Sequence, residues 1–269
     1  MLGTLIRAGD VLDLFTLEEP EWGVTAAAAR LGIGKSLAHE ALATLAEIGL
    51  LRRVARGRYR LGWRTISLAS VLMQSSGLAA CAKPVVRQLA QSRGIAVSVV
   101  AWERDRLLYV NCRRPAANLA AAHRAAVVPA ESLVSAPRRA GELAPIDGSA
   151  AARVLLASRP QAEVKALWEG GCVHTRHATL DALAGDLAAI RGQGWAADAS
   201  TGDREPGHEA ASSAGVAAPI RDPDGGGAAA ICLISPGPPG ELEIRRTALL
   251  AVAAATRISQ ALRAAGAAA

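Results

Sequence analysis

The sequence predicts an α+β protein in which a small helical domain precedes a larger domain with a mostly antiparallel sheet. A chain of 269 residues is longer than one typical domain and has ample length for a core. Short amphipathic helices, a glycine turn and two basic strands follow in unbroken order over residues 25–64. Helix and strand signals then alternate from Cys81 to about Ala265, as in a mixed α/β domain.

Two short helices are expected before the glycine turn. Ala8, Val11, Leu12 and Phe15 would share one face of the first helix, which should stop before Glu19-Pro20 because proline disfavours helical geometry in the residue before it. Thr25 is expected to cap a second helix over 26–31, and Gly32 to close it. The run Gly32-Ile33-Gly34 then predicts a sharp turn.

A third helix is predicted over 35–48. Ala38, Ala41, Leu42 and Leu45 would share one face and pack on the first two helices. The opposite face stays exposed, and in a helix-turn-helix it is the face that enters the major groove of DNA. That face carries Lys35, Ser36, His39, Glu40, Ala43 and Glu47.

A basic hairpin is predicted directly after the third helix, with strands over 50–54 and 58–61 joined at Arg56-Gly57. Six arginines fall in 52–64 with no acidic residue among them, and the formal net charge of the chain is +6. This pattern indicates a winged helix-turn-helix facing DNA phosphates. Outside the third helix, the expected DNA contacts are Thr25, Arg52, Arg56, Arg58 and Tyr59. A small interaction module with solvated arginines remains the alternative.

The sequence resembles the IclR-type bacterial transcriptional regulators along nearly its whole length. The likeness lies in the following segments: Val11–Phe15, Gly32–Ser36, Leu42–Leu45, Gly49–Leu51, Tyr59–Gly62, Pro145–Asp147, Leu187–Arg191, Gly194–Ala196 and Val216–Asp222. The resemblance implies a DNA-binding domain over 1–63, a connecting helix over 64–79 and a GAF-like effector-binding domain over 80–269. It implies a ligand-responsive regulator of a metabolic or catabolic operon. Glu40 stands where this family usually has arginine. Its carboxylate would be repelled by phosphate unless it accepts from a cytosine amino group, so we expect affinity or operator choice to differ.

The connecting helix carries an apolar stripe formed by Ile66, Ala69, Leu72 and Met73. In the resembling family this helix helps to join two subunits, which indicates a homodimer or a pair of dimers. Packing of the stripe against the helix's own domain is an equal alternative.

A small-molecule site is expected in the larger domain. A helix that begins near Asp147, Gly148, Ser149 and Ala150 would offer free amides and a positive dipole end, which suit a small organic acid. The walls should be aliphatic, because aromatic residues make up only 3% of the chain. We expect Gly215, Val216, Ala217, Cys232 and Ile234 to line it, although each could simply be core.

Other chemistry finds weaker support in the sequence. Cys172, His174 and His177 offer three zinc ligands, but a fourth is missing and Arg176 would add a positive charge. We expect no metal, no cofactor and no catalytic residues. Scattered cysteines and an N-terminus without a signal-peptide pattern indicate a cytoplasmic protein. The alternative is a metabolic enzyme or metal-binding protein that uses its N-terminal module for assembly.

Overall fold

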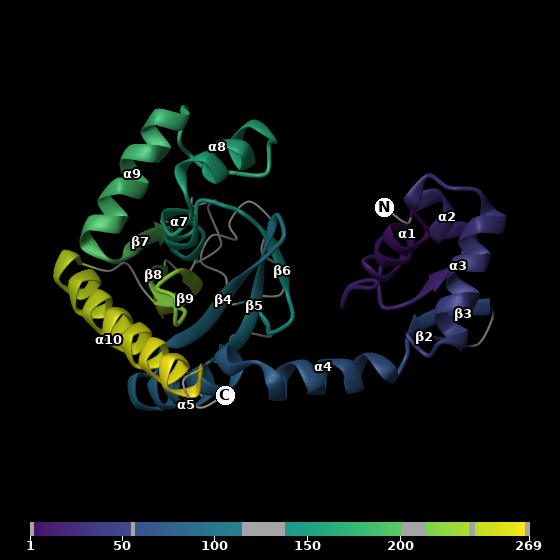
Figure 1. The fold of residues 1–269 in the computed structure, drawn as a ribbon, viewed down its shortest axis with the longest axis horizontal. Helices are drawn as coiled ribbons and strands as arrows, with labels where there is room; N and C mark the ends of the chain where they lie inside the picture. The colour runs from purple at the N-terminus through teal and green to yellow at the C-terminus, as the bar shows by residue number, and fades with distance from the viewer. Residues whose placement is uncertain (1–2, 55–56, 115–137, 201–212, 237–239, 267–269) are drawn as a thin grey trace, which may run out of the picture. The chain divides into compact units, whose positions relative to one another are not determined.

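The computed structural model describes residues 3–54, 57–114, 138–200, 213–236 and 240–266. The chain divides into two compact units, Met1–Ser76 (unit 1) and Gly77–Ala269 (unit 2). Each unit is built around its own hydrophobic core, and Figure 1 shows the elements of both. The predicted α+β class, with an N-terminal helix-turn-helix and a C-terminal α/β domain, is confirmed.

Unit 1 is a winged helix-turn-helix followed by one further helix. Its elements are α1 (Gly3–Leu12), β1 (Trp22–Gly23), α2 (Val24–Leu31), α3 (Lys35–Glu47), β2 (Leu51–Val54), β3 (Arg58–Leu61) and α4 (Arg64–Ser75). The strands pair antiparallel in the order β1-β3-β2, so the predicted hairpin gains a third strand that sequence reasoning missed. Gly32 ends α2 with a left-handed φ of 65° and allows the sharp turn into α3.

The core of unit 1 holds α3 against the other helices and the sheet. Val11, Leu42, Leu45, Leu51 and Tyr59 are all buried in this one cluster. Each fully buried large apolar side chain contributes on the order of 2 kcal/mol. The burial of Ala38, Leu42 and Leu45 confirms the predicted inward face of α3.

One helix cap differs from the sequence prediction. The N-cap of α2 is Gly23, and Thr25 lies inside the first turn with an exposed side chain. The reason is that β1 pairs with β3 up to Gly23 and leads directly into the helix, so the helix begins two residues earlier than expected.

Unit 2 combines one sheet with helices on both sides. Its elements are α5 (Gly77–Arg93), β4 (Ala96–Glu103), β5 (Arg106–Arg113), β6 (Leu143–Pro145), α7 (Ala150–Ala157), α8 (Gln161–Glu169), α9 (Leu180–Gln193), β7 (Ala196–Ser200), β8 (Ser213–Arg221), β9 (Gly227–Pro236) and α10 (Glu241–Gly266). The described strands form a six-stranded sheet in the order β6-β5-β4-β9-β8-β7, and every neighbouring pair is antiparallel.

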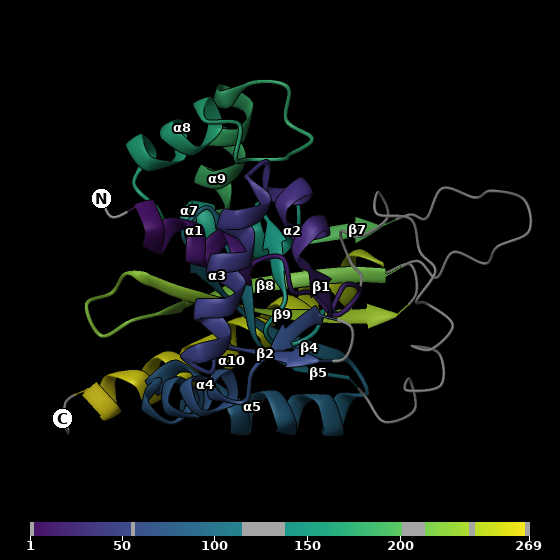
Figure 2. The ribbon, with the colours of Figure 1, turned by 90° about the vertical axis from the view of Figure 1, so that its right-hand side faces the viewer.

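The sheet of unit 2 separates two cores. Helices α7, α8 and α9 pack on one side, and α5 and α10 on the other, as Figure 2 shows from a second direction. Successive strand residues point to opposite sides. Thus Ala217 belongs to the α7 core, whereas Val216 and Ala218 belong to the α10 core.

The connection between the units is not one helix over 64–79. The helix α4 ends at Ser75, and α5 begins at Gly77. Within the described residues no single helix has the length and apolar character of a membrane span, and α4 and α5 reach those criteria only as a broken pair.

Candidate nucleic-acid interface and small-molecule site

The outward face of α3 is polar and accessible. Lys35, Ser36, His39 and Glu40 are exposed, and Ala43 is half-buried near the middle of the helix. The buried side of α3 faces α1, α2 and the sheet, so the helix has no other face to present. Its far end is tied to the next helix, because Arg64 Nη1 donates to the carbonyl oxygen of Ile48 at 2.6 Å.

The hairpin places its arginines on two different faces. Arg52 lies opposite Arg60 on the face that looks away from the core. Arg53 lies opposite Tyr59 on the other face, where its Nε donates to the Tyr59 hydroxyl at 3.1 Å. Two like charges directly opposite on a sheet repel each other unless an anion lies nearby. The outward arginines therefore favour a negatively charged partner.

One of the predicted DNA contacts needs correction. Tyr59 is only 2% exposed and belongs to the core of unit 1, so its ring cannot touch DNA. Its role is instead to hold Arg53, whose guanidinium lies 5.6 Å from the ring centroid. Arg56, another predicted contact, lies outside the described residues, and its role stays a prediction.

A carboxylate that sequence reasoning missed lies beside the hairpin arginines. Glu21 forms ion pairs with Arg58 Nε at 3.3 Å and with Arg60, and its carbonyl oxygen accepts from Arg58 Nη2 at 2.9 Å. Residues 52–64 contain no acidic residue, but Glu21 directly precedes β1, and the pairing of β1 with β3 brings Glu21 next to the hairpin arginines. By contrast Arg52, which lies 6.0 Å from the Trp63 ring centroid, forms no ion pair within the described residues.

An open depression of about 860 Å³ lies where α2, α3 and the hairpin meet. Three of the predicted DNA contacts, Thr25, Lys35 and Arg58, line it together. Glu18, Glu19 and Glu21 also line it. This arrangement suits a phosphate backbone on its basic side, with the Glu21 carboxylate competing for the same arginine.

The small-molecule candidates meet on the α7 side of the sheet in unit 2. Paired residues place Cys112, Ser98, Cys232 and Ala217 in one row across β5, β4, β9 and β8. The next row along the strands contains Ile234, Gly215 and Asp198. Ser98 is 5% exposed, and its hydroxyl oxygen has no hydrogen-bond partner among the described residues. A buried polar atom without a partner is costly, which marks this row as a place for a polar ligand.

Three amides at the start of α7, those of Ser149, Ala150 and Ala152, are not free, contrary to expectation. Asp198 Oδ2 accepts from the Ala150 amide at 2.7 Å, and its Oδ1 accepts from the Gly215 amide at 2.9 Å. Asp147 Oδ1 accepts from the Ser149 amide at 3.0 Å, and the Ser149 hydroxyl caps Ala152. The chain's own carboxylates therefore occupy the positions expected for a ligand anion.

Asp198 links three elements, and sequence reasoning did not single it out. A Cβ atom at position 215 would lie 2.3 Å from Asp198 Oδ1, so only glycine leaves room for the carboxylate. Burial raises the pKa of Asp198, while the hydrogen bonds from Ala150 and Gly215 and the charge of Arg153 act in the opposite direction. Asp198 thus holds the start of α7 against β8.

One wall residue of the expected small-molecule site lies on the wrong side. Val216 packs in the core formed with α5 and α10, because its neighbours Gly215 and Ala217 take the opposite direction. Burial disfavours the thiolate form of both thiols in the row. Burial raises the pKa of Cys112 to about 12 and also raises the pKa of Cys232.

The Cys172, His174 and His177 segment joins an ion-pair network. His177 Nδ1 lies 2.7 Å from the Thr175 hydroxyl, and its Nε2 lies 3.5 Å from Asp186 Oδ2. Asp186 also accepts from the buried Arg153 at 3.1 Å. Among the described residues, no three His, Cys, Asp or Glu side chains gather in an arrangement that could hold a metal ion.

Comparisons with known proteins give one family for both units. Residues 4–55 match the model of the IclR helix-turn-helix domain, and residues 70–257 match that of the bacterial transcriptional regulator IclR C-terminal domain. The chain is 28% identical to the HTH-type transcriptional regulator XynR of Escherichia coli over 203 residues, which are 74% of this chain and 75% of XynR.

Two solved structures share the fold over nearly the full length. An IclR transcriptional regulator from Alicyclobacillus acidocaldarius superposes with a TM-score of 0.74 at 19% identity and covers 97% of this chain and 99% of its own. An IclR homologue from Microbacterium hydrocarbonoxydans, complexed with 4-hydroxybenzoate, gives a TM-score of 0.71 at 24% identity and covers 97% and 99%.

Replacing Glu21 by glutamine tests the electrostatics of the hairpin. We expect Glu21→Gln to bind random-sequence duplex DNA more tightly, with a salt slope steeper by about one, because Arg58 and Arg60 lose a competing carboxylate. Fluorescence anisotropy across a salt series measures both effects. Glu18→Gln is the matched control, since it removes the same charge from an exposed residue on the same depression. Weaker binding by Glu21→Gln would contradict this account.

Proposed function

The chain belongs to the IclR family of bacterial transcriptional regulators, and from this premise we propose that it controls a metabolic or catabolic operon in response to a small organic acid. Members of this family bind DNA through the helix-turn-helix and carry a separate effector-binding domain. The enzyme alternative is therefore set aside. The metal-binding alternative has no cluster to support it among the described residues, where no three His, Cys, Asp or Glu side chains are arranged to hold a metal ion. Because its partner is DNA, we assign the protein to the cytoplasm.

The main support for the DNA-binding mode is the pairing of two surfaces in unit 1. The exposed face of α3 offers hydrogen-bonding side chains such as His39 and Glu40, which suit base edges in a major groove. The hairpin next to it offers exposed arginines such as Arg52, which suit phosphates in any sequence. The proposal therefore separates base reading from backbone binding.

Variants on these two surfaces are expected to behave differently. His39→Ala should change the preferred sequence selected from a random duplex library while leaving the salt slope on random duplex DNA unchanged. Arg52→Gln should weaken binding to every sequence and reduce that slope by about one. Sequence selection followed by anisotropy gives both quantities. Loss of sequence preference by Arg52→Gln alone would assign base reading to the hairpin and contradict the proposal.

We further propose that α4 joins two subunits. The helix has no buried residue within the chain, and the large apolar side chains of its predicted stripe, Ile66, Leu72 and Met73, are all exposed. Exposed apolar side chains along one helix are typical of a protein interface. A dimer would place two helix-turn-helix modules on two half-sites and raise affinity through effective concentration.

A charge on the apolar side of α4 should separate the subunits. We expect Leu72→Asp to shift the protein from dimer to monomer, because the carboxylate would be buried without a partner in the interface. Sedimentation velocity on the full-length chain measures the change. Ser67→Asp places the same charge on the polar side of the same helix and should leave the dimer intact. A Leu72→Asp variant that stays dimeric would exclude this surface.

The effector proposal combines the α7-side row with the neighbour that binds an aromatic acid. The IclR homologue from Microbacterium hydrocarbonoxydans was solved with 4-hydroxybenzoate, which carries one carboxylate and one hydroxyl. In this chain the row offers the unpartnered Ser98 hydroxyl between Cys112 and Cys232, with Tyr109 in the same core. We propose that a small organic acid binds over this row, with Ser98 as a polar contact.

Replacing Ser98 tests the effector site. We expect 4-hydroxybenzoate or a related monocarboxylate to raise the melting temperature of the full-length protein, and phenol, which has no carboxylate, to raise it less. Ser98→Ala should weaken binding about 3- to 10-fold, the value of one hydrogen bond of about 1 kcal/mol. Ser235→Ala, a buried serine whose side chain points to the other side of the sheet, is the matched control. Equal effects of the two variants would contradict a specific role for Ser98.

A further inference from the structure

A second basic surface lies on unit 2, outside the helix-turn-helix and the small-molecule site. It consists of Lys83 and Arg87 on α5 and Arg246 and Arg257 on α10, and all four side chains belong to exposed residues. We propose that this α5/α10 basic face binds the phosphate backbone of duplex DNA that flanks the segment held by α3 and the hairpin. The proposal adds a second DNA contact to the one described above.

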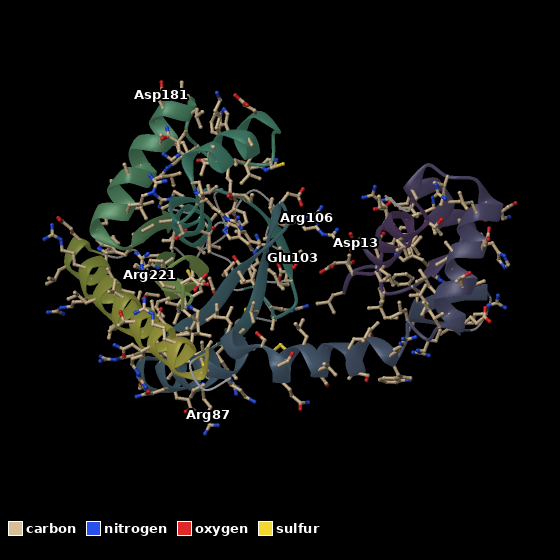
Figure 3. The ribbon with its side chains drawn as sticks, in the orientation of Figure 1. Asp13, Arg87, Glu103, Arg106, Asp181 and Arg221 are labelled. Carbon is tan, nitrogen blue, oxygen red and sulfur yellow. The ribbon has the colours of Figure 1, made fainter. Side chains whose placement is uncertain are left out.

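The four cations belong to one continuous helical layer. Helices α5 and α10 pack on the same side of the sheet, and Arg257 Nη1 donates to Gln88 Oε1 across them at 3.1 Å. Lys83 and Arg87 lie one turn apart and line a shallow depression of about 660 Å³ together with Gln88 and Gln91. Figure 3 shows Arg87 projecting from α5 away from the rest of unit 2.

The charges on this face are not neutralised. The 17 residues of α5 include three basic side chains and no acidic one. In α10 the acidic residues are confined to the first turn, where Glu241 pairs with Arg245. Within the described residues, none of the four face cations forms an ion pair, whereas Arg138, Arg153 and Arg159 of the same unit all do.

The composition of α5 favours phosphate over a lipid surface. The outer side of α5 carries alanine, proline and glutamine between its cations, with no large apolar side chain, whereas α10 exposes Leu242 and Leu249. A membrane-binding helix needs large apolar side chains to enter the acyl region, and α5 has none beside Lys83 and Arg87. Glutamine and arginine together supply the donors typical of backbone contacts to DNA.

The spacing of the cations suits an extended polyanion. Lys83 and Arg87 are separated by about 6 Å along α5, and Arg246 and Arg257 by about 16 Å along α10. One duplex carries a phosphate charge about every 1.7 Å of its axis, so such a row meets several phosphates.

The test uses the full-length chain and a 40-base-pair duplex of random sequence. Lys35→Glu/Arg52→Glu disables the unit 1 interface at two exposed positions and should leave weaker, salt-dependent binding. Adding Lys83→Gln/Arg87→Gln to this variant should abolish that residual binding. In the otherwise unmodified chain, Lys83→Gln/Arg87→Gln should reduce the salt slope by about two per protomer engaged.

The control is Lys165→Gln/Arg176→Gln, which removes the same charges from exposed residues of unit 2 outside this face. Its salt slope should match that of the unmodified chain. Equal slopes for the two double variants, or no residual binding when unit 1 is disabled, would overturn the proposal. Binding of anionic phosphatidylserine vesicles without an effect on DNA would assign the face to lipid instead. The His39 and Arg52 variants test the proposed function separately, so failure here leaves it standing.

Discussion

The one-sided burial of α3 is the constraint on which the DNA-binding surface depends. Leu42 is fully buried and Leu45 is 4% exposed, so the rotation of the helix about its own axis is fixed by the core of unit 1. A rotation that exposed these two side chains would cost several kcal/mol. The polar face therefore points outward because the apolar face has to point inward. The same cluster contains Leu51 and Tyr59, so the hairpin is held in a fixed position relative to α3.

In unit 2 a buried carboxylate has the corresponding role. Asp198 receives amide protons from the first residue of α7 and from β8, and this satisfies donors that a helix start would otherwise leave unpaired. The position is costly for a charge, and burial accordingly raises the pKa of Asp198. The hydrogen bonds offset that cost only while Gly215 leaves space for the carboxylate. The Asp198 carboxylate thus holds the position where the dipole of α7 would favour a ligand anion. On the same side of the sheet, the Ser98 hydroxyl has no partner among the described residues.

The parts of the fold that the sequence predicted correctly depend on short-range patterns. The inward face of α3 follows from its helical spacing, and the hairpin from two basic strands around Arg56-Gly57. The errors concern contacts between distant segments. Glu21 lies more than 30 residues before Arg58, and only the pairing of β1 with β3 brings the two together. The sequence predicts that side chains alternate between the two sides of β8, but not which side comes first. The register of β8 with β9 decides this, and the predicted side of Val216 was therefore wrong. Tyr59 follows the same rule, since its pairing with Trp22 turns it into the core.

If α4 joins two subunits as proposed, its attachment to α3 gives a physical route from subunit association to the DNA-binding surface. The start of α4 is tied to the end of α3, because Arg64 donates to the Ile48 carbonyl oxygen and the Gly62 amide donates to the Leu50 carbonyl oxygen at 2.8 Å. The rest of α4 buries no residue within the chain, so contacts inside the protomer do not fix its position. Whatever covers its apolar side therefore sets the direction in which α3 is held. An effector changes DNA binding through this helix only if it binds more tightly to one of the two arrangements, since a ligand with equal affinity for both shifts neither.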